Sequence, residues 1–290
     1  MGRSKRIALW LLYGGIAAAV LVIGCFDWQI TQAIYKEGSS SGSFFEVSGE
    51  PPSIILFSFC VNVLFVCRKK LWEKLLDYAW GVGGLTYLAD KLAGDLLPNP
   101  EAVGFGHCLL AGVVVESLCA LIFTLVLKRR HKGYFYKGEK DEALDGFCRT
   151  CAQVAVACVL TLFFAFFFKG LWGRVRPRDV MAGKGLFSYV AVPHFFSGNV
   201  SFPSGHTANA AVFMAVSYFV KNKNARVLLR VALAVWLVLV GLSRVRCGAH
   251  YLSDVVTGAT LGLSCFAFAP TVLNKTHKAL EQLRFARSLK

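Results

Sequence analysis

Long runs of uncharged residues limit what this chain can fold into. Four of them approach the roughly 20 residues that a helix needs to cross a bilayer: Ile7–Phe26, Pro51–Cys67, Thr150–Phe168 and Val255–Asn274. With 56% hydrophobic residues and a mean hydropathy of +0.54, the chain is too apolar for an ordinary soluble domain. The sequence therefore predicts an all-α fold, a polytopic transmembrane helical bundle.

The basic residues predict how the helices are oriented. Most of the 32 Lys and Arg residues fall into five groups beside apolar runs, at Arg3–Arg6, Arg68–Lys74, Lys128–Arg149, Lys221–Arg230 and Lys275–Lys290. If all five groups are cytoplasmic, an even number of crossings separates each from the next. Two crossings then lie between Arg68 and Lys128, so Tyr78–Ala89 should cross or re-enter, together with Ala102–Leu127. We expect about eight helices and two cytoplasmic termini.

The distribution of charge also excludes some classes of protein. A net charge of +15 can indicate nucleic-acid binding, but here it mostly flanks apolar runs, which indicates membrane anchoring and no nucleic-acid partner. The N-terminal run is long for a cleaved signal, so an uncleaved first helix is expected. The segment Asp27–Glu50, with Gly38–Gly42, is predicted to be a flexible outside loop. No repeat or soluble domain is apparent, so residues 1–290 are expected to form one integral membrane domain.

Three short polar blocks lie at the ends of apolar segments. They are Lys169 with Arg176-Pro177, then Pro203-Ser204-Gly205-His206, and then Ser243-Arg244 with His250 and Asp254. The predicted helix 150–168 runs outward, 207–220 returns inward, 231–243 runs outward, and the last helix returns. All three blocks are therefore expected on the extracytoplasmic side, where Ser204 would be the N-cap of its helix.

The residue types in these blocks suit phosphoryl transfer. Two arginines can fork onto phosphate oxygens while Lys169 acts as a point charge. A neutral imidazole at His250 is a competent nucleophile, and Asp254, four residues on, can orient it from the same helical face. His206 can protonate the leaving oxygen. No carboxylate cluster suited to two divalent ions appears, so neither a metal nor another cofactor is expected.

Other charged residues keep two interpretations open. Arg174, Arg178 and Arg246 can meet a second phosphate, or they can meet lipid headgroups. Acids inside membrane segments are functional candidates by default, but bundle-facing structural pairs explain Glu116, Asp90 and Asp95 equally well. These three acids are left out of the candidate site.

The three blocks together resemble a known signature, that of the type-2 phosphatidic acid phosphatase superfamily, in its membrane-bound bacterial lipid phosphatase branch. They match it as Lys169-x6-Arg176-Pro177, Pro203-Ser204-Gly205-His206 and Ser243-Arg244-x5-His250-x3-Asp254. The resemblance implies that His250 forms a phosphohistidine, supported by Asp254, and that His206 protonates the leaving group. It implies that the phosphate is held by Lys169, Arg176, Ser204, Gly205 and Arg244. Residues 150–274 would be the catalytic half, and 71–128 a helix pair added to a six-helix core.

The leading functional hypothesis is hydrolysis of a lipid phosphate or pyrophosphate at the outer face of the bacterial inner membrane. Undecaprenyl pyrophosphate is the favoured substrate, with lipid A, phosphatidylglycerophosphate and phosphatidic acid as alternatives. Transfer of the phosphoryl group to another lipid is a second reaction that the same residues permit. A lipid-binding or transport protein is the non-enzymatic alternative, against which the intact His250, His206 and Asp254 argue.

Overall fold

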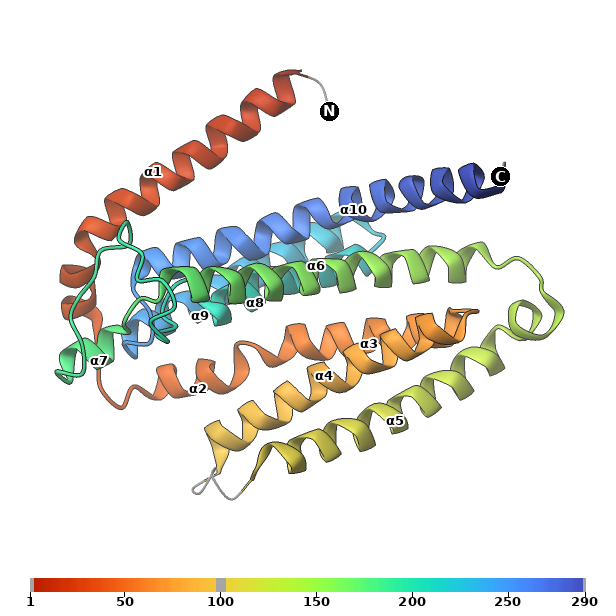
Figure 1. Cartoon of the computed structure of the whole chain (residues 1–290), viewed down its shortest axis with the longest axis horizontal. Coiled ribbons are helices and arrows are strands. Elements are labelled where there is room, and N and C mark those ends of the chain that lie inside the picture. Colours follow the sequence, from red (N-terminus) through yellow and green to blue (C-terminus); the bar gives the residue numbers. More distant parts are fainter. Residues whose placement is uncertain (1–2, 98–102, 289–290) are drawn as a thin grey trace. The chain divides into compact units, whose positions relative to one another are not determined.

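The computed structural model describes residues 3–97 and 103–288, and every regular element in these ranges is helical (Figure 1). In chain order the elements are α1 (Arg3–Ile34), α2 (Ser40–Ser48), α3 (Pro51–Cys67), α4 (Leu71–Leu96), α5 (Phe105–Arg130), η2 (Gly133–Lys137), α6 (Glu142–Trp172), α7 (Pro177–Met181), α8 (Gly205–Val212), η3 (Phe213–Phe219), α9 (Lys223–Arg246) and α10 (Leu252–Ser288). The π-helix is η2 and the 3₁₀ helix is η3. The all-α prediction is confirmed.

Within residues 3–97 and 103–288, six helical segments are long and apolar enough to cross a membrane, which confirms a multi-pass membrane protein. They are Ile7–Ile34, Ser40–Cys67, Phe105–Arg130, Glu142–Met181, Lys223–Arg246 and Leu252–Lys275. About eight helices were expected, and the remaining two behave differently. The predicted span Tyr78–Ala89 lies inside α4, which has 26 residues but carries charged residues toward both ends. The predicted helix 207–220 is divided between α8 and η3.

The prediction of a flexible outside loop at Asp27–Glu50 is wrong. Helix α1 continues to Ile34, and α2 occupies Ser40–Ser48. Ser39 is the N-cap of α2, where its hydroxyl accepts a hydrogen bond from the Gly42 amide at 3.3 Å. A run rich in Gly and Ser is typical of loops, but here its serines supply the cap that starts a helix. The consequence is functional, because this segment reaches the candidate site.

The chain divides into two compact units. The first comprises Met1–Gly49, Thr161–Ala211 and Leu233–Leu263, and the second comprises Glu50–Leu160, Val212–Ala232 and Ser264–Lys290. In the first unit, small buried residues of α8 (Ala208, Ala210 and Ala211) allow close packing. Two of them, Ala210 and Ala211, form a core with Leu237 and Val240 of α9. The predicted site residues all belong to this first unit.

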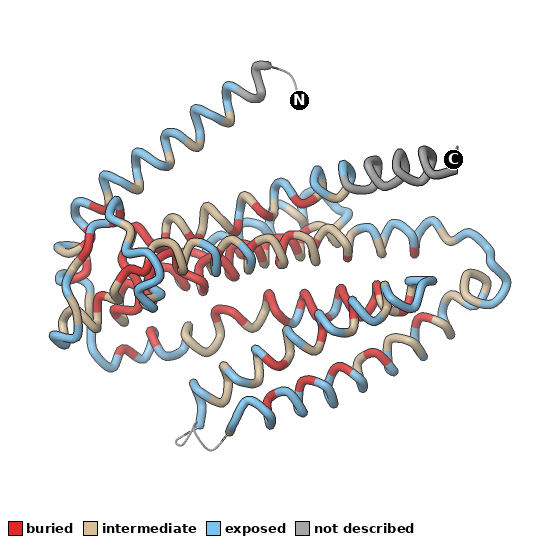
Figure 2. Tube along the Cα trace, viewed as in Figure 1, coloured by how far each residue is buried: buried red, intermediate tan, exposed pale blue. Residues whose placement is uncertain are grey.

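In the second unit, α3, α4 and α5 pack against one another. The buried residues of α5 recur at about one-turn intervals and form one stripe, seen as regular red bands in Figure 2. They include Cys108, Gly112, Glu116 and Ala120. The other faces of α5 expose large apolar side chains, as at Leu110, Leu118 and Leu125, which is the pattern of a helix that faces lipid.

Two of the three membrane acids have structural partners. The amide Nδ2 of Asn62 lies 3.1 Å from each carboxylate oxygen of Glu116, and both residues are buried. The Lys91 ammonium lies 3.5 Å from carboxylate oxygens of both Glu50 and Asp95. These contacts favour the interpretation of Glu116 and Asp95 as bundle-facing pairs.

Candidate active site

The structure places the predicted site residues at helix ends within the first unit. Lys169 lies in the last turn of α6, and Arg176 is the N-cap of α7, with Pro177 at its first position. Ser204, Gly205 and His206 begin α8. Arg244 lies in the last turn of α9, while His250 precedes α10 and Asp254 occupies its first turn. The polar blocks therefore lie at the starts and ends of helices and not in their middles.

His250 is buried, and its imidazole has a defined orientation. The ring atom Nδ1 lies 2.5 Å from the backbone carbonyl oxygen of Ser201. A carbonyl oxygen only accepts, so Nδ1 carries the proton and Nε2 carries the lone pair. The nearest oxygen of Asp254 is 4.0 Å from Nδ1. The hydrogen bond that the sequence led us to expect from Asp254 is thus made by the Ser201 carbonyl.

Asp254 supports the site through other contacts. Its Oδ2 accepts a hydrogen bond from the Ser201 hydroxyl at 2.6 Å and another from the Tyr251 amide at 3.0 Å. The second of these is a capping-box contact, in which the third residue of α10 satisfies an amide at the helix start. Because Asp254 holds Ser201, and Ser201 holds His250, its action on the imidazole is indirect.

Arg174 joins α1 to α10 through a fully buried ion-pair network. Its Nη1 lies 2.7 Å from Oδ1 of Asp254, and its Nη2 lies 3.0 Å from Oδ2 of Asp27. Its Nε donates to the Ser188 carbonyl at 2.9 Å, and its guanidinium lies 3.9 Å from the centroid of the Tyr251 ring. With no exposed surface and these partners, Arg174 is a structural cation, so it does not fit the second-phosphate role that the sequence left open.

Asp27 of α1 completes this network from the opposite end of the sequence. Its Oδ1 accepts a hydrogen bond from the Ser253 amide at 3.0 Å, and its Oδ2 accepts one from the Ser253 hydroxyl. The carboxylate thus satisfies an amide at the start of α10, where the helix dipole favours a negative charge. Sequence reasoning missed Asp27, although an isolated acid at the end of an apolar helix is a signal for a functional residue.

The backbone of the third block sets the distance between Arg244 and His250. The Arg244 carbonyl oxygen accepts hydrogen bonds from the Ala249 amide at 3.0 Å and from the His250 amide at 3.2 Å. Gly248 turns the chain with a φ of +65°, a conformation that glycine adopts without strain. The five-residue interval in the block therefore corresponds to the C-terminal turn of α9.

Two buried N–H groups of arginine side chains are available as hydrogen-bond donors. Within the part of the chain that the structure describes, Nη1 of Arg244 and Nε of Arg176 have no hydrogen-bond partner. Arg244 is otherwise held by α2, where Nη2 donates to the Gly42 carbonyl and Nη1 lies 3.7 Å from a Glu46 carboxylate oxygen. Free buried donors on guanidinium groups suit an oxyanion such as phosphate.

Helix α8 contributes the second block. The predicted N-cap is confirmed, since the Ser204 hydroxyl accepts a hydrogen bond from the Thr207 amide at 3.4 Å. The Ser204 amide donates to the Asp254 carbonyl at 3.0 Å, which ties α8 to α10. This approach requires Gly258, because a Cβ there would lie 2.4 Å from the Ser204 carbonyl oxygen. His206 is also fixed, and its Nε2 donates to the Glu46 carbonyl at 3.1 Å.

The electrostatic environment of His250 favours its neutral form. Burial lowers its pKa well below the ordinary value of 6.5, and the charges of Lys169, His206 and Arg176 lower it further. These three side chains are therefore close enough to act on the imidazole. The arrangement combines a neutral, oriented imidazole with a set of cations, which is what a phosphoryl-transfer site with a histidine nucleophile would need.

Comparisons with known proteins find a matching family and several relatives. A model of the PAP2 superfamily matches residues 150–278. A lipid A 1-phosphatase from Rhizobium johnstonii is 34% identical over 155 residues, which cover 49% of this chain and 57% of that protein. Phosphatidylglycerophosphatase B from Bacillus subtilis is 40% identical over 119 residues, which cover 35% of this chain and 58% of that protein.

A third relative is aligned over a longer region. A lipid A 4'-phosphatase from Rhizobium leguminosarum is 36% identical over 191 residues, which cover 64% of this chain and 74% of that protein. The chain spans little more than half the length of the other two relatives. No solved structure shows significant similarity to it.

Proposed function

The chain belongs to the PAP2 superfamily, and on that premise we propose that it hydrolyses the phosphate ester of a membrane lipid, without a metal ion, through a phosphohistidine at His250. The observation that carries this proposal is the 2.5 Å contact between Nδ1 of His250 and the Ser201 carbonyl. It leaves the Nε2 lone pair for attack, beside cations that can hold the phosphate.

The reaction takes place in two displacements. In the first, Nε2 of His250 attacks phosphorus, the bond to the ester oxygen breaks, and His206 gives its proton to that oxygen, which releases the lipid alcohol. In the second, water attacks phosphorus, gives a proton to His206, and displaces Nε2. Inorganic phosphate leaves, and both histidines return to their starting states.

The remaining site residues stabilise the charge on phosphorus. Lys169, Arg176 and Arg244 hold the equatorial oxygens, and the available donors on the two arginines support this role. The Gly205 and His206 amides precede the first intrahelical bond of α8, which joins the Ala208 amide to Ser204. They are therefore suited to an anion at the helix start, with Ser204 fixing that start.

A phosphate-release assay on detergent-purified protein tests the proposal. The substrates are phosphatidic acid, phosphatidylglycerophosphate, lipid A and undecaprenyl pyrophosphate, which the sequence analysis favoured. We expect His250→Ala to abolish release and His194→Ala, in the loop that follows α7, to retain it. Full activity of His250→Ala would refute the assignment of the nucleophile. Dependence on Mg²⁺ together with loss in EDTA would refute the metal-free mechanism.

Two further measurements separate the alternatives. Phosphate that appears on an acceptor lipid instead of in solution would indicate a phosphotransferase, and no release with any lipid would favour a lipid-binding protein.

We place the site on the extracytoplasmic side, with both termini cytoplasmic. An impermeant maleimide should then label Lys184→Cys in intact cells and Lys137→Cys only after lysis. The reverse pattern would contradict this orientation.

A further inference from the structure

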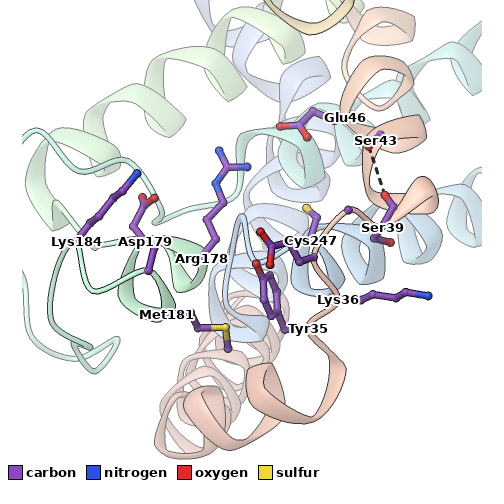
Figure 3. Close-up of a pocket in the computed structure, with 13 residues that line it drawn as sticks. Tyr35, Lys36, Ser39, Ser43, Glu46, Arg178, Asp179, Met181, Lys184 and Cys247 are labelled. Atoms are coloured by element: carbon purple, nitrogen blue, oxygen red, sulfur yellow. Dashed lines mark hydrogen bonds between the residues drawn. The ribbon is translucent and has the colours of Figure 1, made fainter.

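A cavity of about 700 Å³ opens beside the candidate phosphate site, in the first unit (Figure 3). Its walls come from the α1–α2 connection, from α2 and α7, and from the turn after α9. The volume lies within the roughly 300–1,000 Å³ that is usual for small-ligand sites. None of the residues proposed to act in the phosphate-transfer steps lines this cavity.

Glu46 connects the cavity with the phosphate site. Its side chain lines the cavity, its carboxylate lies 3.7 Å from Arg244, and its carbonyl holds His206. Arg178, which also lines the cavity, follows Arg176 by two residues. A group attached to a phosphate held by these residues would therefore enter the cavity.

The walls are fixed by backbone hydrogen bonds. The Lys36 amide donates to the Arg246 carbonyl at 2.8 Å, and the Arg178 amide donates to the Gly248 carbonyl at 2.9 Å. The α1–α2 connection and α7 are thus both tied to the turn that leads to His250. The cavity belongs to the same framework as the nucleophile.

The lining is polar and its charges balance. Three residues with cationic side chains and three with carboxylates line the cavity, and three more residues add hydroxyl groups: Lys36, Arg178 and Lys184, then Glu37, Glu46 and Asp179, and then Tyr35, Ser39 and Ser43. Such a surface can donate and accept hydrogen bonds in many directions, which suits a group rich in hydroxyls. A second phosphate would meet the repulsion of the carboxylates, and an isoprenoid chain would leave the charged groups desolvated.

We propose that this cavity binds the hydroxylated part of the lipid headgroup to which the reacting phosphate is attached. The substrate class is then a lipid whose phosphate is an ester of a sugar or of a glycerol headgroup, and not a polyprenyl diphosphate. The burial of Arg174, which removes one candidate partner for a second phosphate, agrees with this assignment. The inference rests on the proposed function, because it assumes that the phosphate is bound at His250.

The test compares substrates that differ in the group bearing the phosphate. Phosphatidylglycerophosphate and lipid A carry the phosphate on a headgroup glycerol or a sugar with free polar groups. Phosphatidic acid carries it on diacylglycerol, which has no free hydroxyl, and farnesyl diphosphate carries it on an isoprenoid. We expect kcat/KM for one of the first two to exceed that for both of the others by about tenfold or more, because a lost neutral hydrogen bond changes kcat/KM by roughly two- to tenfold.

A double variant, Tyr35→Phe with Lys184→Ala, removes two polar groups from the cavity and leaves the catalytic residues intact. It should lower kcat/KM for the preferred substrate about tenfold and leave phosphatidic acid within about twofold of wild type. Lys137→Ala, which removes an exposed cation far along the sequence in η2, is the matched control and should change neither value.

Two results would overturn the inference while leaving the proposed function intact. One is a wild-type preference for phosphatidic acid or farnesyl diphosphate, or no preference at all. The other is an equal loss on all substrates in the double variant. No phosphate release from any substrate would overturn the proposed function and the inference with it.

Discussion

Removal of Arg174 should destabilise the first unit by several kcal/mol. In the structure this guanidinium contacts two buried carboxylates, at 3.0 Å on Asp27 and 2.7 Å on Asp254. Arg174→Met keeps much of the side-chain volume but leaves both carboxylates without a cation. Breaking one buried ion pair typically costs about 3–5 kcal/mol. Because two carboxylates lose the same partner here, we expect at least about 4 kcal/mol.

The loss is measurable as a lower thermal midpoint in detergent. At roughly 2–4 °C per kcal/mol for a chain of this size, the midpoint should fall by about 10 °C. Adding Asp27→Asn to Arg174→Met removes one of the uncompensated charges and should recover about 2 kcal/mol, because contacting residues couple by roughly 0.5–3 kcal/mol. Alone, Asp27→Asn should destabilise the protein, since it weakens both the ion pair and the contacts with Ser253.

Arg178→Met is the matched control, since it makes the same substitution four residues further along the chain. Arg178 is only partly buried and forms no ion pair among the described residues, so we expect a cost below about 1 kcal/mol. An Arg174→Met protein with the wild-type midpoint would refute the reasoning. So would a double variant with Asp27→Asn that is less stable than Arg174→Met alone.

Three further predictions concern activity. The pKa of His250 is held below 6.5, first by burial and then by the nearby cations. Because attack on phosphorus needs the neutral imidazole, kcat/KM should fall only below that pH. Acid should also favour unfolding, since the unfolded chain binds the proton more readily than the folded protein does. A pH–rate profile with its acid midpoint above about 7 would contradict this. Gly258→Ala should lower the free energy of unfolding by about 1–3 kcal/mol and reduce activity, because the added Cβ would meet the Ser204 carbonyl. Gly83→Ala, whose added Cβ would meet nothing within 4 Å, should be tolerated. Ser201→Ala loses the hydroxyl contact with Asp254 but keeps the carbonyl on His250, so its kcat should fall less than that of Asp254→Ala; equal losses in the two variants would show that Asp254 acts mainly through this hydroxyl.

Local patterns in the sequence were sufficient to predict most of the helices and the start of α8 at the second block. A long apolar run predicts a helix, because a helix satisfies the backbone polar groups internally when the segment lies in a bilayer. Ser204 before Gly205 is typical of an N-cap. The break between α8 and η3 at Phe213 was not predictable, because the segment 207–220 reads as one continuous apolar helix.

The contacts that orient the His250 imidazole depend on tertiary structure. A spacing of four residues predicted that Asp254 would meet His250, but α10 begins only at Leu252, so the two residues do not share a helical face. The oxygen that meets Nδ1 belongs to the backbone of Ser201, 49 residues earlier, and a backbone atom has no signature in the sequence. Asp27 lies 226 residues from Ser253, whose amide donates a hydrogen bond to it, and local sequence patterns do not predict contacts at such a separation.

The turn that joins Arg244 to His250 bears on how the protein tolerates bilayers of different thickness. A multi-pass protein adapts to membrane thickness by tilting its helices, and such tilting would disturb a site assembled only from side chains on separate helices. Here the Arg244 carbonyl holds the amides of Ala249 and His250 directly, so the guanidinium and the imidazole move as one body when α9 tilts. An insertion or deletion between Arg244 and His250 should therefore not be tolerated.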